Sequence, residues 1–182
     1  MKRGQDQYLL HWRGNADLHV AVPTFEALRD EGLIGAWGVS NFDMDDMNDL
    51  WRIPGGDRCA TNQVLYHPAS RGIEYDLLPW CAARGLPVVA YSPLGNAGRS
   101  ADGLHEHPAF AAIARRHGIG PPAAVLAWAV RSGRVLAIPE SGDAGHVRDN
   151  AQALSVTLDA EDLAAIDAAF PPPARREPLD VL

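Results

Sequence analysis

The feature that most constrains the fold is a unit that recurs along the chain: an apolar run, a polar end and then a helical stripe. Residues 33–42 show it most clearly, because an apolar run there breaks into the polar pair Ser40 and Asn41. A buried strand that ends in polar side chains is typical of a parallel strand, and α/β proteins place their sites at the carboxyl ends of such strands. The unit therefore predicts an α/β protein with functional residues at its strand ends.

Strands and helices alternate along the whole chain, and no hairpin signal joins two strands. The predicted strands are residues 8–12, 34–39, 60–66, 86–91 and 135–138, and the predicted helices are residues 20–30, 44–51, 75–84, 108–117, 123–132, 146–154 and 159–170. Alternation without hairpins favours a parallel sheet with right-handed crossovers.

Acidic residues mark the starts of two predicted helices. Asp43 and Asp159 precede these helices and are typical N-caps. The carboxylate pairs at residues 45–46 and 161–162 are interpreted as solvated first-turn acids. Pro23 falls in the first turn of its predicted helix, where proline is tolerated.

The length of the chain leaves two architectures open. Five strands in 182 residues are too few for a closed (β/α)₈ barrel, which typically takes about 250 residues. The alternatives are a small open α/β sheet and part of a barrel. No repeat or linker interrupts the chain, so we expect a single domain over residues 1–182 with a Pro-rich tail at residues 171–182.

The composition excludes some classes of partner. The net charge is -7 and no basic stripe stands out, which argues against nucleic acid or an acidic membrane as partner. No apolar run reaches transmembrane length. A ligand with a phosphate group remains compatible with this charge, because helix N-termini bind anions through backbone N–H groups.

Cysteine and histidine spacing predicts neither a disulfide nor a metal centre. Cys59 and Cys81 are far apart and form no CxxC motif, so we expect reduced thiols in a cytosolic protein without a signal peptide. His105 and His107 are too isolated for a metal site. Lys2 is the only lysine in the chain.

Five stretches in order along the chain resemble the aldo-keto reductase family. They are YLLHW (residues 8–12), GVSNF (38–42), NQVLYHP (62–68), VAYSPLG (89–95) and IPES (138–141), the last followed by Asn150. The resemblance covers the chain from Tyr8 to about Phe170. It implies a (β/α)₈ TIM barrel that reduces aldehydes and ketones with a nicotinamide cofactor, and five strands that correspond to the fourth to eighth of that barrel.

The resemblance also implies what this chain lacks. The first three β/α units of the barrel are expected to be missing, which makes the fold an incomplete (β/α)₈ barrel. In the family these units carry the catalytic Asp, Tyr and Lys, and the Tyr is the proton donor. Lys2, at the extreme N-terminus, cannot be the buried lysine that lowers the pKa of a tyrosine.

Residues in or directly after four predicted strands match the nicotinamide end of the family's site. By resemblance, His11 orients the substrate carbonyl, and Ser40, Asn41 and Gln63 bind the nicotinamide carboxamide, whose donor and acceptor suit amide side chains. Tyr91 matches the aromatic residue that stacks on the nicotinamide ring. Without the resemblance, Ser40 and Asn41 would be helix caps and Tyr91 a packing residue.

Later residues match the phosphate-binding part of the site. By resemblance, Ser92, Leu94 and the loop to Gly98 wrap the cofactor pyrophosphate. Residues 141–150, at a helix N-terminus after the last strand, match the adenosine phosphate site. Its predicted contact residues are Ser141, His146 and Asn150, together with Glu140.

Glu140 is where the sequence departs from the family pattern. NADPH-using members commonly have a lysine at this position, and a carboxylate would repel a 2′-phosphate. The cofactor is therefore expected to be NADP or NAD, with a weakened preference for NADP.

Two functions follow from the sequence. The first is an oxidoreductase with a small carbonyl substrate, represented by its cofactor-binding part. The second is a non-catalytic protein that binds a nicotinamide dinucleotide or a partner. The open edges of an incomplete barrel would favour self-association in that case.

Overall fold

One sheet of parallel strands forms the centre of the molecule. The computed structural model of the chain describes residues 5–95 and 103–182. Its five strands are hydrogen-bonded in the order in which they occur along the chain. They are β1 (Gln5–Leu10), β2 (Ile34–Ser40), β3 (Asn62–Leu65), β4 (Val88–Tyr91) and β5 (Val135–Ala137). The predicted parallel sheet is confirmed.

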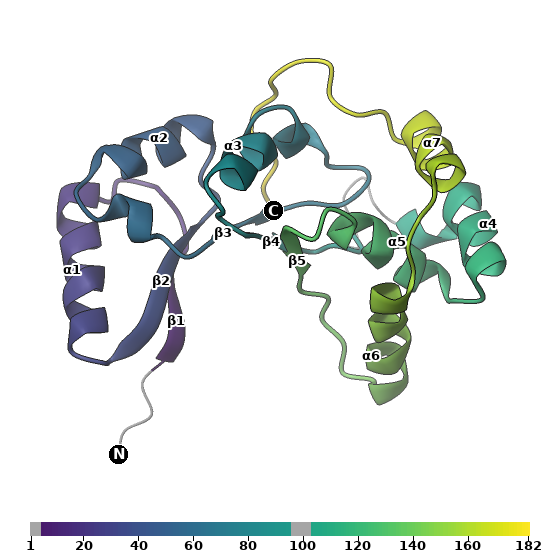
Figure 1. Cartoon of the computed structure of the whole chain (residues 1–182), viewed down its shortest axis with the longest axis horizontal. Coiled ribbons are helices and arrows are strands. Elements are labelled where there is room, and N and C mark those ends of the chain that lie inside the picture. The colour runs from purple at the N-terminus through teal and green to yellow at the C-terminus, as the bar shows by residue number, and fades with distance from the viewer. Residues whose placement is uncertain (1–4, 96–102) are drawn as a thin grey trace.

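Helices follow each strand along the chain and lie outside the sheet (Figure 1). They are α1 (Leu18–Asp30), α2 (Met44–Arg52), α3 (Leu77–Ala83), α4 (Pro108–His117), α5 (Pro121–Val130), α6 (Ala144–Ala151) and α7 (Ala160–Ala169). Figure 1 shows α1 and α2 beside β1 and β2, whereas α4 to α7 gather at the opposite end of the sheet. Among the helices that the structure describes, none is long and apolar enough to cross a bilayer.

Three helices, α1, α5 and α6, begin two residues earlier than predicted, and an aspartate caps two of them. Asp17 accepts a hydrogen bond from the backbone N–H of His19, so α1 starts at Leu18. Pro23 is then inside the helix and not in its first turn. Because proline has no backbone N–H, the helix continues past it with one backbone hydrogen bond missing. In the same way, Asp143 starts α6 at Ala144, two residues before the predicted start.

The predicted N-caps Asp43 and Asp159 are confirmed, and both are part of capping boxes. The prediction of a solvated Asp162 is wrong, because this residue is only 1% exposed. Its carboxylate accepts from the backbone N–H of Asp159 at 3.1 Å and lies 2.8 Å from Nε2 of His117. Burial is thus compensated by a hydrogen bond from the start of α7 and by partners on α4, Arg116 and His117, which sequence periodicity does not reveal.

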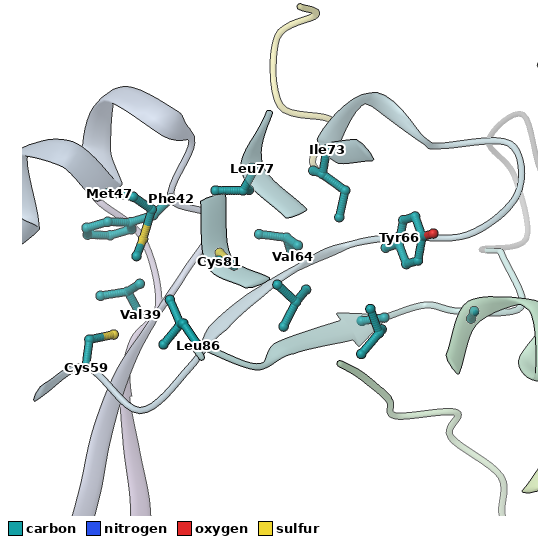
Figure 2. Close-up of a cluster of buried hydrophobic side chains, with 14 of the residues drawn as sticks. Val39, Phe42, Met47, Cys59, Val64, Tyr66, Ile73, Leu77, Cys81 and Leu86 are labelled. Carbon is teal, nitrogen blue, oxygen red and sulfur yellow. The ribbon is translucent and has the colours of Figure 1, made fainter. Parts of the chain in front are cut away.

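The core lies between the sheet and the helices that cover it, and part of it is formed by the helices that follow β2 and β3. Val39, Met47 and Leu77 are among the side chains that meet there (Figure 2). Each such buried aliphatic side chain contributes roughly 2 kcal/mol through removal from water. Cys59 and Cys81 are free and buried in this core, and burial raises the pKa of each thiol to about 12. This core fixes the strands whose carboxyl ends carry the predicted site.

Candidate cofactor site

The register of the sheet brings the predicted nicotinamide residues to one side. Ser40 lies opposite Gln63 in the pairing of β2 with β3. Tyr91 is the last residue of β4, and His11 directly follows β1. Because parallel strands all end on the same side of a sheet, His11, Ser40 and Tyr91 converge at the carboxyl ends of β1, β2 and β4. Gln63 is the second residue of β3, and the register places it beside the end of β2.

Asn41 links three of these strand ends. Its side-chain nitrogen donates to the carbonyl oxygen of His11 and to Oγ of Ser40, both at 3.3 Å. Its Oδ1 accepts from the hydroxyl of Tyr91 at 3.0 Å. The backbone of Asn41 has a φ of 57°, a left-handed conformation that asparagine adopts more readily than most residues. Asn41 therefore joins the ends of β1, β2 and β4, with only 8% of its surface exposed.

The backbone carbonyl of Gln63 completes this network. It accepts one hydrogen bond from Oγ of Ser40 and one from the backbone N–H of Asn41, each 2.8 Å long. The side-chain amide of Gln63 makes no hydrogen bond with any residue that the structure describes. Its donor and acceptor are therefore open to a ligand that offers one of each.

Tyr91 is half-buried beside the end of the chain. Burial raises the pKa of its hydroxyl, a hydrogen bond with the backbone of Leu182 lowers it, and the charge of Asp180 raises it again. The net shift is upward, so the hydroxyl stays protonated and donates to Asn41. The ring is thus fixed at its hydroxyl from two sides.

His11 stays exposed at the rim of this group. The centre of its ring lies 5.8 Å from that of Trp12, in a tilted arrangement. Its backbone carbonyl accepts a hydrogen bond from Asn41, but among the described residues no hydrogen bond holds the imidazole. The imidazole is therefore open to a small polar molecule.

The segment after β4 is described only in part. Ser92 has a φ of 46°, which turns the chain sharply after Tyr91. Leu94 is half-buried and packs against the core. The predicted pyrophosphate loop to Gly98 extends into residues 96–102, which lie outside the described residues.

The predicted adenosine phosphate residues lie apart from this network, after β5. Glu140 and His146 are exposed, and Ser141 and Asn150 are half-exposed. No hydrogen bond or ion pair between described residues connects these four to the residues around Asn41. The structure therefore groups the predicted residues into two sets and not into one.

Asp143 occupies the N-terminus of α6, where the phosphate was predicted. Its carboxylate accepts from the backbone N–H groups of Gly145 at 2.7 Å and of His146 at 3.0 Å. These two hydrogen bonds lower the pKa of Asp143. A second carboxylate therefore follows Glu140 by three residues at this end of the predicted site.

Sequence reasoning missed the contribution of the Pro-rich tail. Asp180 accepts a hydrogen bond from Oγ of Ser70 at 2.7 Å, and Leu182 reaches Tyr91. Arg176 of the tail also pairs with acidic helix starts, and no local sequence pattern indicates this pairing. Across the two described stretches, no group of three or more acidic, histidine or cysteine side chains has the geometry of a metal centre.

This arrangement, polar side chains at the carboxyl ends of neighbouring parallel strands, is that of a barrel-type α/β enzyme. The chain matches the model of the aldo/keto reductase family over residues 4–170 and therefore belongs to that family. Methylglyoxal reductase YeaE of Escherichia coli (strain K12) is 48% identical over 177 residues, which cover 97% of this chain and 62% of that protein. Human aldo-keto reductase family 1 member A1 is 31% identical, with 90% of this chain and 57% of that protein covered.

Solved structures agree with this assignment. The crystal structure of an aldo/keto reductase from Klebsiella pneumoniae in complex with NADP and acetate superposes with a TM-score of 0.95 at 51% identity, covering 99% of this chain and 64% of that one. A thermostable aldo-keto reductase, Tm1743, gives a TM-score of 0.80 at 31% identity, covering 91% and 60%. The five strands correspond to the C-terminal portion of the barrel, which confirms the predicted fold class. This chain spans less than two thirds of the length of each of these relatives.

Proposed function

We propose that this chain is the cofactor-binding portion of an NAD(P)H-dependent aldo-keto reductase that converts aldehydes or ketones to alcohols. The observation that supports this best is the network around Asn41, which joins Ser40 and Tyr91 beside the open side chain of Gln63. A relative named methylglyoxal reductase and a Klebsiella structure with bound NADP support the same reaction class.

The residues divide the work of binding between them. The dinucleotide supplies a hydride to the carbonyl carbon, and the carbonyl oxygen takes up a proton. Tyr91 offers its ring to the nicotinamide, and Gln63, with Ser40 and Asn41, offers polar groups to its carboxamide. His11 is exposed beside them and orients the carbonyl of a small substrate.

The proton donor is the part of the reaction that we do not assign to this chain. In the family a tyrosine beside a lysine carries it, and the single lysine here, Lys2, is the second residue. We therefore expect the 182-residue chain to bind a dinucleotide without reducing carbonyls. Purified chain mixed with NADPH and methylglyoxal or other simple aldehydes tests this by absorbance at the nicotinamide band, and turnover would contradict it.

Binding is tested most directly at Tyr91. Addition of NADPH or NADH should quench the tryptophan fluorescence of the wild-type chain. Tyr91→Leu removes the ring and should weaken binding roughly fivefold, because an aromatic contact contributes about 1 kcal/mol. Tyr91→Phe keeps the ring and should retain most of the affinity. Tyr75→Leu alters a half-exposed tyrosine elsewhere and serves as the matched control; an equal effect of both Leu variants would refute the assignment.

We also propose a weakened preference for NADP. Glu140 and Asp143 place two carboxylates at the predicted adenosine phosphate end, and both would oppose a 2′-phosphate. His146, Ser141 and Asn150 remain the candidate contacts there. The absence of a disulfide between Cys59 and Cys81 is compatible with the proposed cytoplasmic location.

A second candidate function, self-association, is favoured by the open edges of the sheet. Tyr8 on β1 is 49% exposed, and Leu136 on β5 is 60% exposed. A groove of about 270 Å³ lies between α5, β5 and α6, with Leu126, Val147 and Leu154 in its walls. Exposed strand edges beside apolar surface favour pairing with a second copy. Light scattering during gel filtration tests this: Leu136→Glu should shift a dimer to monomer, and a wild-type monomer would rule the candidate out.

A further inference from the structure

The tail at residues 171–182 turns back over the site. After α7 the chain contains no helix or strand, and Figure 1 shows the tail arching over the molecule to end beside β3 and β4. Leu179 packs against the main core on the way. The far end of the chain is thus brought to the carboxyl ends of the strands.

Arg176 anchors this path through acidic side chains of two helix starts. Its guanidinium lies 2.9 Å from Oδ2 of Asp45, 3.3 Å from Oδ2 of Asp76 and 4.0 Å from Oδ2 of Asp43. Asp43 and Asp45 belong to the start of α2, and Asp76 precedes α3. A single exposed ion pair contributes little, but one planar cation shared by three carboxylates also relieves their mutual repulsion.

Beyond this anchor the tail reaches the proposed nicotinamide residues. Oδ2 of Asp180 accepts from Oγ of Ser70 at 2.7 Å, and the backbone of Leu182 hydrogen-bonds the hydroxyl of Tyr91. That hydroxyl also donates to Asn41. The tail therefore ends at the hydroxyl of the tyrosine whose ring the proposed function assigns to the nicotinamide.

We propose that Arg176 is a positioning residue for the dinucleotide: by holding residues 176–182 against α2 and α3, it keeps Leu182 on Tyr91 and so fixes the tyrosine ring. This proposal rests on the proposed function. Arg176 itself touches neither the ring nor its hydroxyl, so its effect on a ligand must pass through the tail.

A separate anchor holds the helix before the tail. Arg71 is buried, lies 2.7 Å from Oδ1 of Asp167 and donates to the carbonyl oxygen of Phe170. Loss of Arg176 therefore should release the end of the chain without releasing α7. The variant Arg176→Ala is expected to stay folded, with a melting temperature close to that of wild type.

The experiment compares Arg176→Ala with Arg175→Ala. Arg175 is the adjacent exposed arginine, and it makes no ion pair with any described residue, so it matches charge and position. Amide hydrogen exchange without nucleotide should speed up at least tenfold at residues 179–182 in Arg176→Ala and stay unchanged in Arg175→Ala. Affinity for NADPH and NADH should fall about twofold in Arg176→Ala alone, a smaller loss than removal of the ring in Tyr91→Leu causes, and Arg176→Lys should recover part of it.

Two further measurements separate positioning from general loosening. Truncation after Leu179 keeps the anchor but removes Leu182, and it should reproduce the loss of affinity. In a Tyr91→Phe background, which lacks the hydroxyl, Arg176→Ala should cause no additional loss. Faster tail exchange with unchanged affinity, a full additional loss in the Tyr91→Phe background, or equal behaviour of Arg175→Ala would each overturn the proposal. If the wild-type chain binds neither NADPH nor NADH, the proposed function fails and the positioning role fails with it. The exchange data still show separately whether Arg176 holds the tail.

Discussion

The two ends of the proposed cofactor site are held in opposite ways. Around Asn41, the polar groups are buried and hydrogen-bonded across strand ends, with Ser40 only 1% exposed. At the other end, Glu140 and His146 are exposed, and α6 contributes no buried residue. Strand register and core packing fix the first end, whereas a single capping aspartate organises the second.

This difference indicates which property each end controls. A buried polar network is costly to disturb, because any group that loses its partner stays away from water. It is therefore suited to hold a ring in one place. Exposed charges interact weakly and tolerate substitution, so the second end can change its preference for a phosphate without affecting the fold. The predictions below test this division.

The largest loss of stability is expected when a glycine at the buried end, Gly38, is replaced by alanine, which adds a methyl group. A Cβ on Gly38 would lie 2.7 Å from the carbonyl oxygen of Thr61, whereas a Cβ on Gly142 would meet nothing within 4 Å. Gly38→Ala should lower the free energy of unfolding by about 3 kcal/mol, since the backbone of β3 would have to shift. Gly142→Ala should change it by less than about 0.5 kcal/mol. Urea unfolding measures both, and similar values for the two variants would break the comparison.

The second-largest loss of stability is expected at Asn41, which joins the strand ends. Asn41→Ala removes hydrogen bonds to His11 and Tyr91 and should cost about 2 kcal/mol of unfolding free energy. Asn41→Gly should recover about 1 kcal/mol of this, because glycine adopts the left-handed backbone at φ 57° without strain. Asn150→Ala on α6 is the control and should be nearly neutral. If Asn41→Gly were no more stable than Asn41→Ala, the backbone part of this account would be wrong.

The sequence predicted the strands that carry the buried end better than the long-range contacts that connect them. Alternating apolar and polar character is local, so the strands, the parallel sheet and the position of Ser40 at a strand end follow from it. The hydrogen bond between Tyr91 and Asn41 joins residues 50 positions apart, and it depends on register, which no local pattern encodes.

Long-range charge pairing was the main property that the sequence did not reveal. The carboxylates at residues 45–46 have the pattern of solvated helix starts, and Asp45 is indeed 75% exposed. Nothing local indicates that Arg176, 131 positions later, returns to it. Asp162 shows the same limit, since its burial depends on His117 from another helix.

At the exposed end, reversal of one charge should change the choice of cofactor. Glu140→Lys replaces repulsion of a 2′-phosphate by attraction and should raise the ratio of NADPH to NADH affinity about tenfold. Fluorescence quenching at low and high salt measures this, and the gain should shrink as salt screens it. Glu31→Gln, an exposed carboxylate after α1, is the control. A strong preference of wild type for NADPH would show that Glu140 does not act as proposed.

The smallest effect is a pH dependence confined to the exposed end. Hydrogen bonds from the backbone N–H groups of Gly145 and His146 lower the pKa of Asp143 below the ordinary aspartate value. Its contribution to the stability of α6 is therefore complete above that ordinary value and is lost as the pH falls through the lowered one. Amide exchange in α6, corrected for the intrinsic effect of pH, should increase in this window. Asp143→Asn keeps a neutral cap and should flatten the dependence of the exchange rate on pH.

The backbone N–H of Asn41 is the internal control, because it is bonded to an uncharged carbonyl and should stay protected from exchange over the same pH range. Loss of its protection in step with α6 would show that the two ends are not independent.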